Sequence, residues 1–206
     1  MSQTRPLSYQ HRFEAGSDPT KPLILLLHGT GGDENDLLSL GRAIAPGAAL
    51  LSPRGKEVER GMARFFRRMS EGVFDEDDIR QRAGELAAFI AEARAAYRLG
   101  APIAVGYSNG ANIAAAVLML HPDALAGAVL MRAISPFRDA PKVDLAGKSV
   151  LLLSGQGDPM APAESAGRLA ATLTGAGAVV RREFLPTGHQ LSEADAALAR
   201  DWLAHL

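Results

Sequence analysis

A serine with a glycine two residues away on either side follows a short apolar segment, in Gly106-Tyr107-Ser108-Asn109-Gly110. The apolar segment, Ile103–Tyr107, predicts a strand, and the alanine-rich segment behind it predicts a helix from Asn109 to about Leu120. A sharp turn from strand to helix would expose the Ser108 hydroxyl, and the glycines would let neighbouring backbone approach closely. This context favours Ser108 as a nucleophile over the alternative that it only caps the helix.

A glycine-rich segment, His28-Gly29-Thr30-Gly31-Gly32, directly follows the apolar run Leu23–Leu27. Nucleophilic attack on an ester carbonyl leaves an anionic oxygen that needs preorganised hydrogen-bond donors. We expect one donor from the backbone amide after the nucleophile, that of Asn109, and the other from the amide of Thr30. The spacing excludes a phosphate-binding loop, since the segment fits neither Gly-x-Gly-x-x-Gly nor a Gly-Lys-Ser/Thr ending. We interpret His28 as a residue that orients this loop rather than one that transfers protons.

An acid and a base are expected on two later loops, each behind a predicted strand. The strand Val150–Leu153 precedes a tight loop that ends in Asp158, and the final strand, Val179–Phe184, precedes a loop that contains His189. The chain order Ser, Asp, His is one that hydrolytic triads adopt, with both loops at the same sheet edge as the nucleophile. The sequence therefore predicts His189 as general base and Asp158 as the acid that orients it, ahead of the competing carboxylates Asp123, Asp139, Asp144 and Glu164.

Strands and helices must alternate along the chain to position these loops. The period-two pattern around His11 predicts an opening edge strand, and three- and four-residue apolar spacing predicts a long helix over Ile79–Tyr97. A closing helix is expected to begin at Ser192, which has a capping-box partner in Asp195. The alternation predicts an α/β fold with a mostly parallel sheet covered by helices on both faces. We expect one domain over residues 1–206.

The composition is that of an ordinary globular protein, with 47% hydrophobic and 22% charged residues and a net charge of −1. No basic block indicates nucleic acid as a partner, and no apolar run is long enough for membrane insertion. The chain has no cysteine, which excludes a thiol nucleophile and thiolate metal sites. With no basic patch followed by an apolar run at the N-terminus, we expect a cytoplasmic protein. The sequence has no clustered His/Asp/Glu set with ligand spacing, and we expect neither a metal nor a cofactor. The sequence does not determine the oligomeric state, and a homodimer is one of the alternatives.

These segments together resemble the small carboxylesterase, phospholipase and acyl-protein thioesterase family and its dienelactone-hydrolase-like relatives. The matching pieces are Leu25–Gly32, Val105–Gly110, Gly155–Pro159 and Gly188-His189, and Arg64-Phe65-Phe66 is similar to an element of some bacterial members. The resemblance implies an α/β-hydrolase fold without a large lid domain, and catalysis through an acyl-enzyme.

Two departures favour the serine carboxylesterase branch of that family. Acyl-protein thioesterases usually have glutamine after the nucleophile, where this chain has Asn109, and dienelactone hydrolases use cysteine, which the chain lacks. The expected function is hydrolysis of small carboxylic esters by Ser108, His189 and Asp158. Thioesterase or lysophospholipase activity with the same triad is the first alternative, and a non-catalytic ligand-binding member of the fold is the second.

The expected substrate is a small, uncharged ester with a short acyl chain, bound in an open pocket. Candidate pocket residues come from the irregular stretch Pro53–Phe74 and the loop Met131–Phe137, and are Arg64, Phe65, Phe66, Met131 and Phe137. For each apolar residue of this set, packing in the core is as good an explanation as lining the pocket. Arg64 could draw a carboxylate-bearing substrate, although an arginine beside an apolar loop is usually just solvated.

Overall fold

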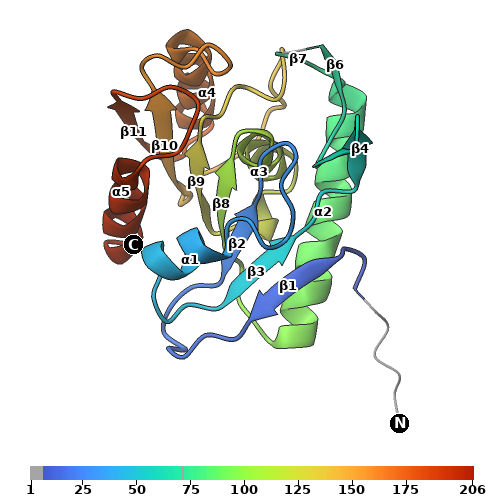
Figure 1. The fold of residues 1–206 in the computed structure, drawn as a ribbon, viewed down its shortest axis with the longest axis vertical. Coiled ribbons are helices and arrows are strands. Elements are labelled where there is room, and N and C mark those ends of the chain that lie inside the picture. Colours follow the sequence, from blue (N-terminus) through green and yellow to red (C-terminus); the bar gives the residue numbers. More distant parts are fainter. Residues whose placement is uncertain (1–6, 71) are drawn as a thin grey trace.

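A central sheet of seven strands forms the middle layer of the computed structural model, which describes residues 7–70 and 72–206 (Figure 1). The first strand runs antiparallel to its neighbour and all other pairs in this sheet are parallel, which confirms the expected mostly parallel sheet with an opening edge strand. In sheet order the strands are β1 (His11–Glu14), β3 (Leu50–Pro53), β2 (Ile24–Leu27), β8 (Ile103–Tyr107), β9 (Gly127–Met131), β10 (Ser149–Gly155) and β11 (Val179–Leu185).

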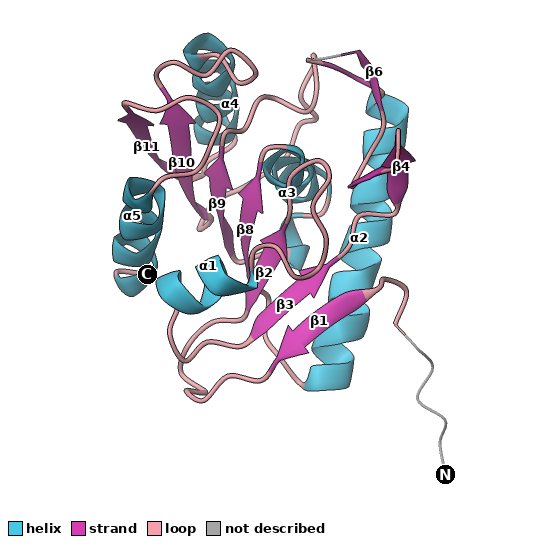
Figure 2. Ribbon diagram, viewed as in Figure 1, coloured by secondary structure: helices cyan, strands magenta, loops and turns pink. Residues whose placement is uncertain are grey.

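Helices cover both faces of this sheet (Figure 2). Successive strand residues point to opposite faces, so Leu25 and Leu27 enter one apolar cluster and Ile24 and Leu26 the other. One cluster is closed by α1 (Leu38–Ile44) and α5 (Glu193–Ala204), the other by α2 (Glu76–Tyr97), α3 (Asn109–Leu120) and α4 (Ala163–Gly175). A short 3-10 helix, Pro122–Ala124, follows α3.

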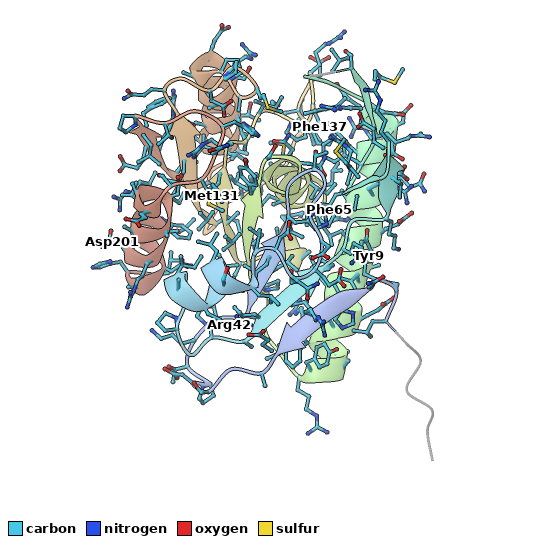
Figure 3. All side chains as sticks on the ribbon, in the orientation of Figure 1. Tyr9, Arg42, Phe65, Met131, Phe137 and Asp201 are labelled. Atoms are coloured by element: carbon cyan, nitrogen blue, oxygen red, sulfur yellow. The ribbon has the colours of Figure 1, made fainter. Side chains whose placement is uncertain are left out.

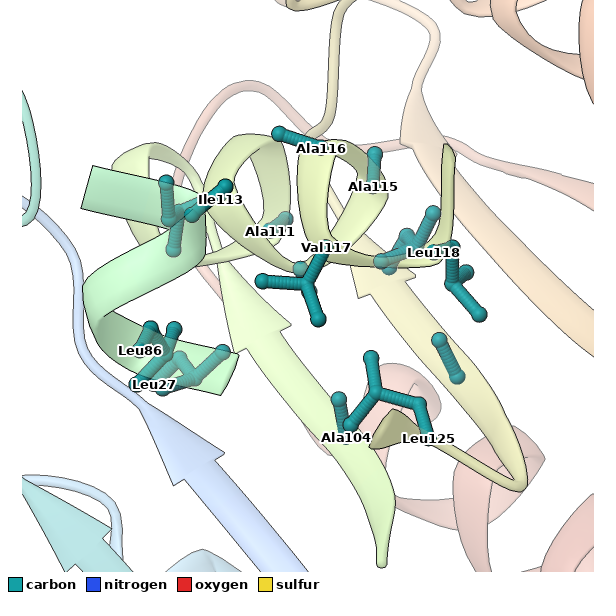
Figure 4. Packing of buried hydrophobic residues seen from close by; sticks show 14 of the residues in the cluster. Leu27, Leu86, Ala104, Ala111, Ile113, Ala115, Ala116, Val117, Leu118 and Leu125 are labelled. Carbon is teal, nitrogen blue, oxygen red and sulfur yellow. The ribbon is translucent and has the colours of Figure 1, made fainter. Parts of the chain in front are cut away.

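Helix α3 is the most deeply buried helix of the core, with every residue from Asn109 to Met119 buried. Apart from Asn109 and Asn112 its side chains are apolar, as expected for a helix that lies between the sheet and α2, and Figure 4 shows several of them in one cluster with Leu27 and Leu86. The small side chains of its alanines let the helix lie close to the strands. This packing fixes the start of α3, directly after Ser108, against the ends of β2 and β8.

The boundaries of two helices follow from local capping signals in the sequence. The Asp75 carboxylate accepts a hydrogen bond from the backbone N–H of Asp78 and so begins α2. The expected capping box at the last helix is confirmed, because the Asp195 carboxylate accepts the backbone N–H of Ser192, 2.8 Å away.

The stretch Pro53–Phe74, expected to be irregular, contains two small hairpins, and that expectation was wrong. They are β4 (Glu57–Glu59) with β5 (Met62–Arg64), and β6 (Arg68–Ser70) with β7 (Val73–Phe74). The first turns through Arg60 and Gly61, both at positive φ, which is the backbone of a tight hairpin turn. The hairpins lie along α2 (Figure 1). No helix in the described part of the chain is long and apolar enough to cross a membrane.

Candidate active site

Ser108 lies at the tight turn between β8 and α3, with φ 52° and ψ −114°. A non-glycine residue at positive φ is strained, and the packing around the turn holds it there. A Cβ added to Gly110 would come 2.0 Å from the carbonyl oxygen of Leu27, and one added to Gly106 would come 2.6 Å from that of Gly110. Both positions therefore need glycine. The Ser108 side chain makes no capping hydrogen bond, so the alternative of a helix cap is wrong.

The three residues predicted as a triad come together at the carboxyl ends of β8, β10 and β11. Ser108 Oγ lies 2.9 Å from His189 Nε2, and His189 Nδ1 lies 2.8 Å from Asp158 Oδ2. The other carboxylate oxygen, Oδ1, accepts the backbone N–H groups of Met160 and Ala161 at 2.8 and 3.0 Å. This arrangement can hold Nδ1 protonated, which leaves Nε2 free to accept the serine proton.

Thr30 and Asn109, the two expected oxyanion donors, line the same cavity as Ser108. Neither backbone N–H donates a hydrogen bond to any described residue. The next amide of the glycine-rich loop, that of Gly31, is occupied, because it donates to the carbonyl oxygen of Ala63 at 2.9 Å. Two unoccupied amides beside a serine hydroxyl are a donor set of the kind that a tetrahedral oxyanion requires.

His28 holds the glycine-rich loop in place through both of its ring nitrogens and does not line the cavity. Its Nδ1 lies 2.7 Å from the carbonyl oxygen of Gly29, and its Nε2 accepts the backbone N–H of Gly55 at 3.0 Å. The ring is therefore neutral with a proton on Nδ1, and burial lowers its pKa. Both nitrogens are occupied, in accord with an orienting residue rather than a proton carrier.

Sequence reasoning missed Arg132, which holds the loop that carries His189. Its guanidinium is fully buried and donates to the carbonyl oxygens on either side of the histidine, those of Gly188 at 3.0 Å and Gln190 at 2.9 Å. It also contacts both carboxylate oxygens of Asp195, at 2.7 and 2.9 Å. The fixed fork of five donors suits this role, which a lysine could not fill. The only signal in the sequence is an arginine directly after an apolar strand.

A cavity of about 40 Å³ opens beside Ser108 and adjoins a larger groove of about 680 Å³. The two share Gly72, Phe74 and Ile134 in their walls. The groove continues past Phe137 toward α4, and Figure 3 shows Phe137 near the edge between the hairpins and α4. Ser108 is thus reached through a small polar cavity that leads into a broader, partly apolar space.

Two of the five expected pocket residues line these spaces, Arg64 in the cavity and Phe137 in the groove. The assignment of Phe65, Phe66 and Met131 to the pocket was wrong, because all three are buried in the core and line neither space. Both phenylalanines pack in the cluster under α2 and α3, and strand alternation sends Met131 to the opposite cluster. Figure 3 shows Phe65 and Met131 within the body of the molecule.

Known proteins resemble the chain over nearly its whole length. A family model described as the alpha/beta hydrolase fold matches residues 22–148, and one described as TAP-like protein matches residues 131–204. The chain is 46% identical over 195 residues to MhqD of Bacillus subtilis (strain 168), whose name assigns it provisionally as a hydrolase, with 94% of this chain and 96% of that protein covered.

Two solved carboxylesterases have the same architecture. The Bacillus cereus carboxylesterase is 42% identical, with a TM-score of 0.94 and coverage of 96% of this chain and 94% of that one. The Mesorhizobium loti carboxylesterase is 32% identical, with a TM-score of 0.92 and coverage of 99% of this chain and 100% of that one.

Proposed function

Since the chain belongs to the α/β-hydrolase family, we propose that it is a serine carboxylesterase that hydrolyses small carboxylic esters through Ser108, His189 and Asp158. The observation that carries the proposal is the unbroken chain of contacts from hydroxyl to imidazole to carboxylate, at 2.9 and 2.8 Å. The similarity to carboxylesterases supports ester hydrolysis.

In the acylation step, Ser108 Oγ attacks the ester carbonyl carbon while His189 Nε2 takes the hydroxyl proton. The amides of Thr30 and Asn109 hold the oxyanion of the tetrahedral intermediate. The acyl carbon–oxygen bond then breaks, and His189 returns the proton to the departing alkoxide. An ester of the serine remains and the alcohol leaves.

In the deacylation step, water replaces the serine hydroxyl as nucleophile. His189 takes a proton from water, the same two amides hold the second oxyanion, and Ser108 leaves with the proton. The Asp158 carboxylate stabilises the imidazolium in both steps, and its own proton balance does not change.

Short acyl chains are the proposed preference, because the space directly beside Ser108 is only about 40 Å³. Longer chains must pass Phe74 and Ile134 to reach the groove. Discrimination per methylene in such a space is modest, about 1–3 kcal/mol, so related esters should be accepted together.

The test is labelling with a fluorophosphonate, followed by a substrate panel. One label is expected, on Ser108, and Ser108→Ala should abolish both the label and turnover, on the scale of ~10⁶-fold for a triad nucleophile. Ser39→Ala, at an exposed position on α1, is the matched control. The panel compares p-nitrophenyl esters of increasing chain length with a lysophospholipid and a palmitoyl thioester.

Catalytic efficiency should be highest for short acyl esters. A preference for the lysophospholipid or the thioester would replace the substrate class and leave the triad standing. Absence of a label together with absence of turnover would refute the proposal.

A further inference from the structure

Hydrogen-bond donors without acceptors gather around the cavity beside Ser108. Arg64 donates through Nε to the carbonyl oxygen of Phe66 and through Nη1 to Thr30 Oγ1, while its Nη2 has no hydrogen-bond partner in the described part of the chain. Asn112, also in the wall, uses its Oδ1 to accept the N–H of Ile134, and its Nδ2 has no described acceptor. A polar cavity with spare donors is complementary to a ligand that supplies acceptors.

The charges in the cavity wall are also unbalanced. Arg64, Arg68 and Arg132 all line it, and none of the described lining residues is acidic. Asp195 neutralises Arg132. A single carboxylate, that of Glu59, serves the other two arginines, at 3.3 Å from Arg64 Nε and 3.0 Å from Arg68 Nη2. One positive charge among these groups is left without a described counterion.

Arg64 is not a solvated surface arginine, which was the alternative that the sequence offered for it. The residue is 3% exposed, so its charge is screened far less than that of a surface arginine. Burial and the neighbouring Arg68 both lower the Arg64 pKa, which means that the cation, although still protonated, is less stable in this cavity than in water. An anion in the cavity would reverse this unfavourable balance.

We propose that the cavity binds a carboxylate of the substrate, so that the preferred esters are monoanionic. The proposal rests on the proposed function and narrows its substrate class from small carboxylic esters in general to esters that carry a carboxylate close to the scissile bond. It replaces the uncharged ester that the sequence led us to expect. The spare donors of the cavity wall, Arg64 Nη2 and Asn112 Nδ2, can supply hydrogen bonds to a carboxylate, and a cavity of about 40 Å³ suits so small a group. The carboxylate resides on the acyl side, as in a half-ester of a dicarboxylic acid, or on the alcohol side, as in an ester of a hydroxy acid.

The reaction remains a simple hydrolysis. One water is consumed, the acyl carbon–oxygen bond breaks, and the products are a carboxylic acid and an alcohol. The second carboxylate takes no part in bond making and keeps its charge throughout.

The experiment compares each anionic ester with its neutral methyl-capped partner. For the acyl side these are mono-p-nitrophenyl succinate and p-nitrophenyl methyl succinate. For the alcohol side they are 5-butyryloxy-2-nitrobenzoate and its methyl ester. The measured quantity is the ratio of kcat/KM for the anionic ester to that for the neutral one. The ratio should exceed one in at least one pair, and the pair that shows it identifies the side that carries the carboxylate. It should also fall as salt is raised.

Arg68→Gln removes the positive charge that the shared Glu59 leaves unbalanced, and should therefore lower this ratio about tenfold or more. Arg67→Gln is the matched control, because Arg67 is an adjacent arginine that pairs with Asp75, is 62% exposed and does not line the cavity. The same loss of net charge there should leave the ratio within about twofold of wild type.

Three results would overturn the proposal: a ratio of one or less in both pairs, no change in Arg68→Gln, or an equal change in Arg67→Gln. If none of the four esters is hydrolysed, the proposed function fails, and calorimetry on Ser108→Ala decides the carboxylate site separately. Monomethyl succinate should then bind and dimethyl succinate should not, with binding lost in Ser108→Ala/Arg68→Gln. Absence of that Arg68-dependent binding would overturn the carboxylate site as well.

Discussion

Asp158→Asn tests the proposed mechanism most directly, because the surroundings of Asp158 dictate which way the new amide must face. Oδ1 of the carboxylate accepts two backbone N–H groups, those of Met160 and Ala161, and Oδ2 faces His189 Nδ1. An amide nitrogen cannot accept hydrogen bonds, so the Asn oxygen must stay with the two N–H groups. Its NH₂ then donates to Nδ1 and forces the proton onto Nε2. In that tautomer Nε2 cannot take the proton of Ser108.

The size of the effect follows from the cost of turning the amide around. The flipped amide would leave the buried backbone N–H of Ala161 and the part-buried one of Met160 without an acceptor, at about 1–3 kcal/mol each. The productive tautomer is therefore disfavoured by about 2–6 kcal/mol, or from about 30-fold to about 10⁴-fold. Loss of the carboxylate charge, which stabilises the imidazolium, adds to this. A drop in kcat of roughly 10⁴ near neutral pH is expected, the scale found for this change in a serine protease triad.

The assay is kcat on a short-chain p-nitrophenyl ester from pH 6 to pH 9, with circular dichroism to verify the fold. Asp139→Asn, at an exposed position, and Asp144→Asn, in a surface turn, serve as controls and should stay within a few-fold of wild type. An Asp158→Asn enzyme within tenfold of wild type would refute the reasoning. Equal damage from either control would show that the acid had been assigned to the wrong carboxylate.

Three further outcomes are expected. Arg132→Met leaves the buried Asp195 carboxylate, which is 1% exposed, without its cation. The free energy of unfolding, measured by urea titration, should therefore fall by about 3–5 kcal/mol. A loss below about 1 kcal/mol would contradict the structural role of Arg132. The pKa of His28 is lower in the folded chain than its ordinary value of 6.5, so below about pH 6.5 the unfolded chain binds a proton that the folded chain does not. The free energy of unfolding should therefore fall as pH drops from 7 to 5, by at most about 1.4 kcal/mol per pH unit for this residue. His28→Asn should flatten that dependence, and an unchanged slope would show that other groups cause it. Dialysis against a chelator should leave esterase activity intact, and rescue by zinc of activity lost on dialysis would count against the mechanism.

The order of strands and helices and the positions of the candidate triad could be predicted because their signals are local. Each buried strand is a short apolar run, and Ser108 and Asp158 each follow one, whereas His189 follows the edge strand β11, whose sequence is more charged. Parallel pairing then brings the carboxyl ends of those strands together without further information. The capping box of Ser192 and Asp195 predicted the start of α5 in the same local way.

The contacts that brace the candidate site could not be predicted, because their partners are distant in sequence. Arg132 and Asp195 are 63 positions apart, and nothing in either neighbourhood identifies the other. The hairpins of Pro53–Phe74 are short and highly charged, so they lack the apolar alternation that reveals a strand. Because the hairpins were not predicted, the environment of Arg64 was not predicted either. Arg64 lies at the end of β5 and contacts Thr30 and Glu59.

Arg64 links the proposed carboxylate site to the proposed oxyanion hole, and this link predicts how an anionic ester gains its advantage. Its Nη1 donates to Thr30 Oγ1 at 2.6 Å, and the Thr30 amide is one of the two unoccupied donors beside Ser108. A carboxylate bound to the same guanidinium would restrain Arg64 and, through it, the loop that carries this amide. Restraint of a donor that acts only on the oxyanion favours the transition state over the bound ester, and therefore raises kcat. Simple attraction of the anion would lower KM alone. A half-ester that differs from its methyl-capped partner in KM but not in kcat would show that Arg64 recognises the substrate without transmitting that contact to the oxyanion loop.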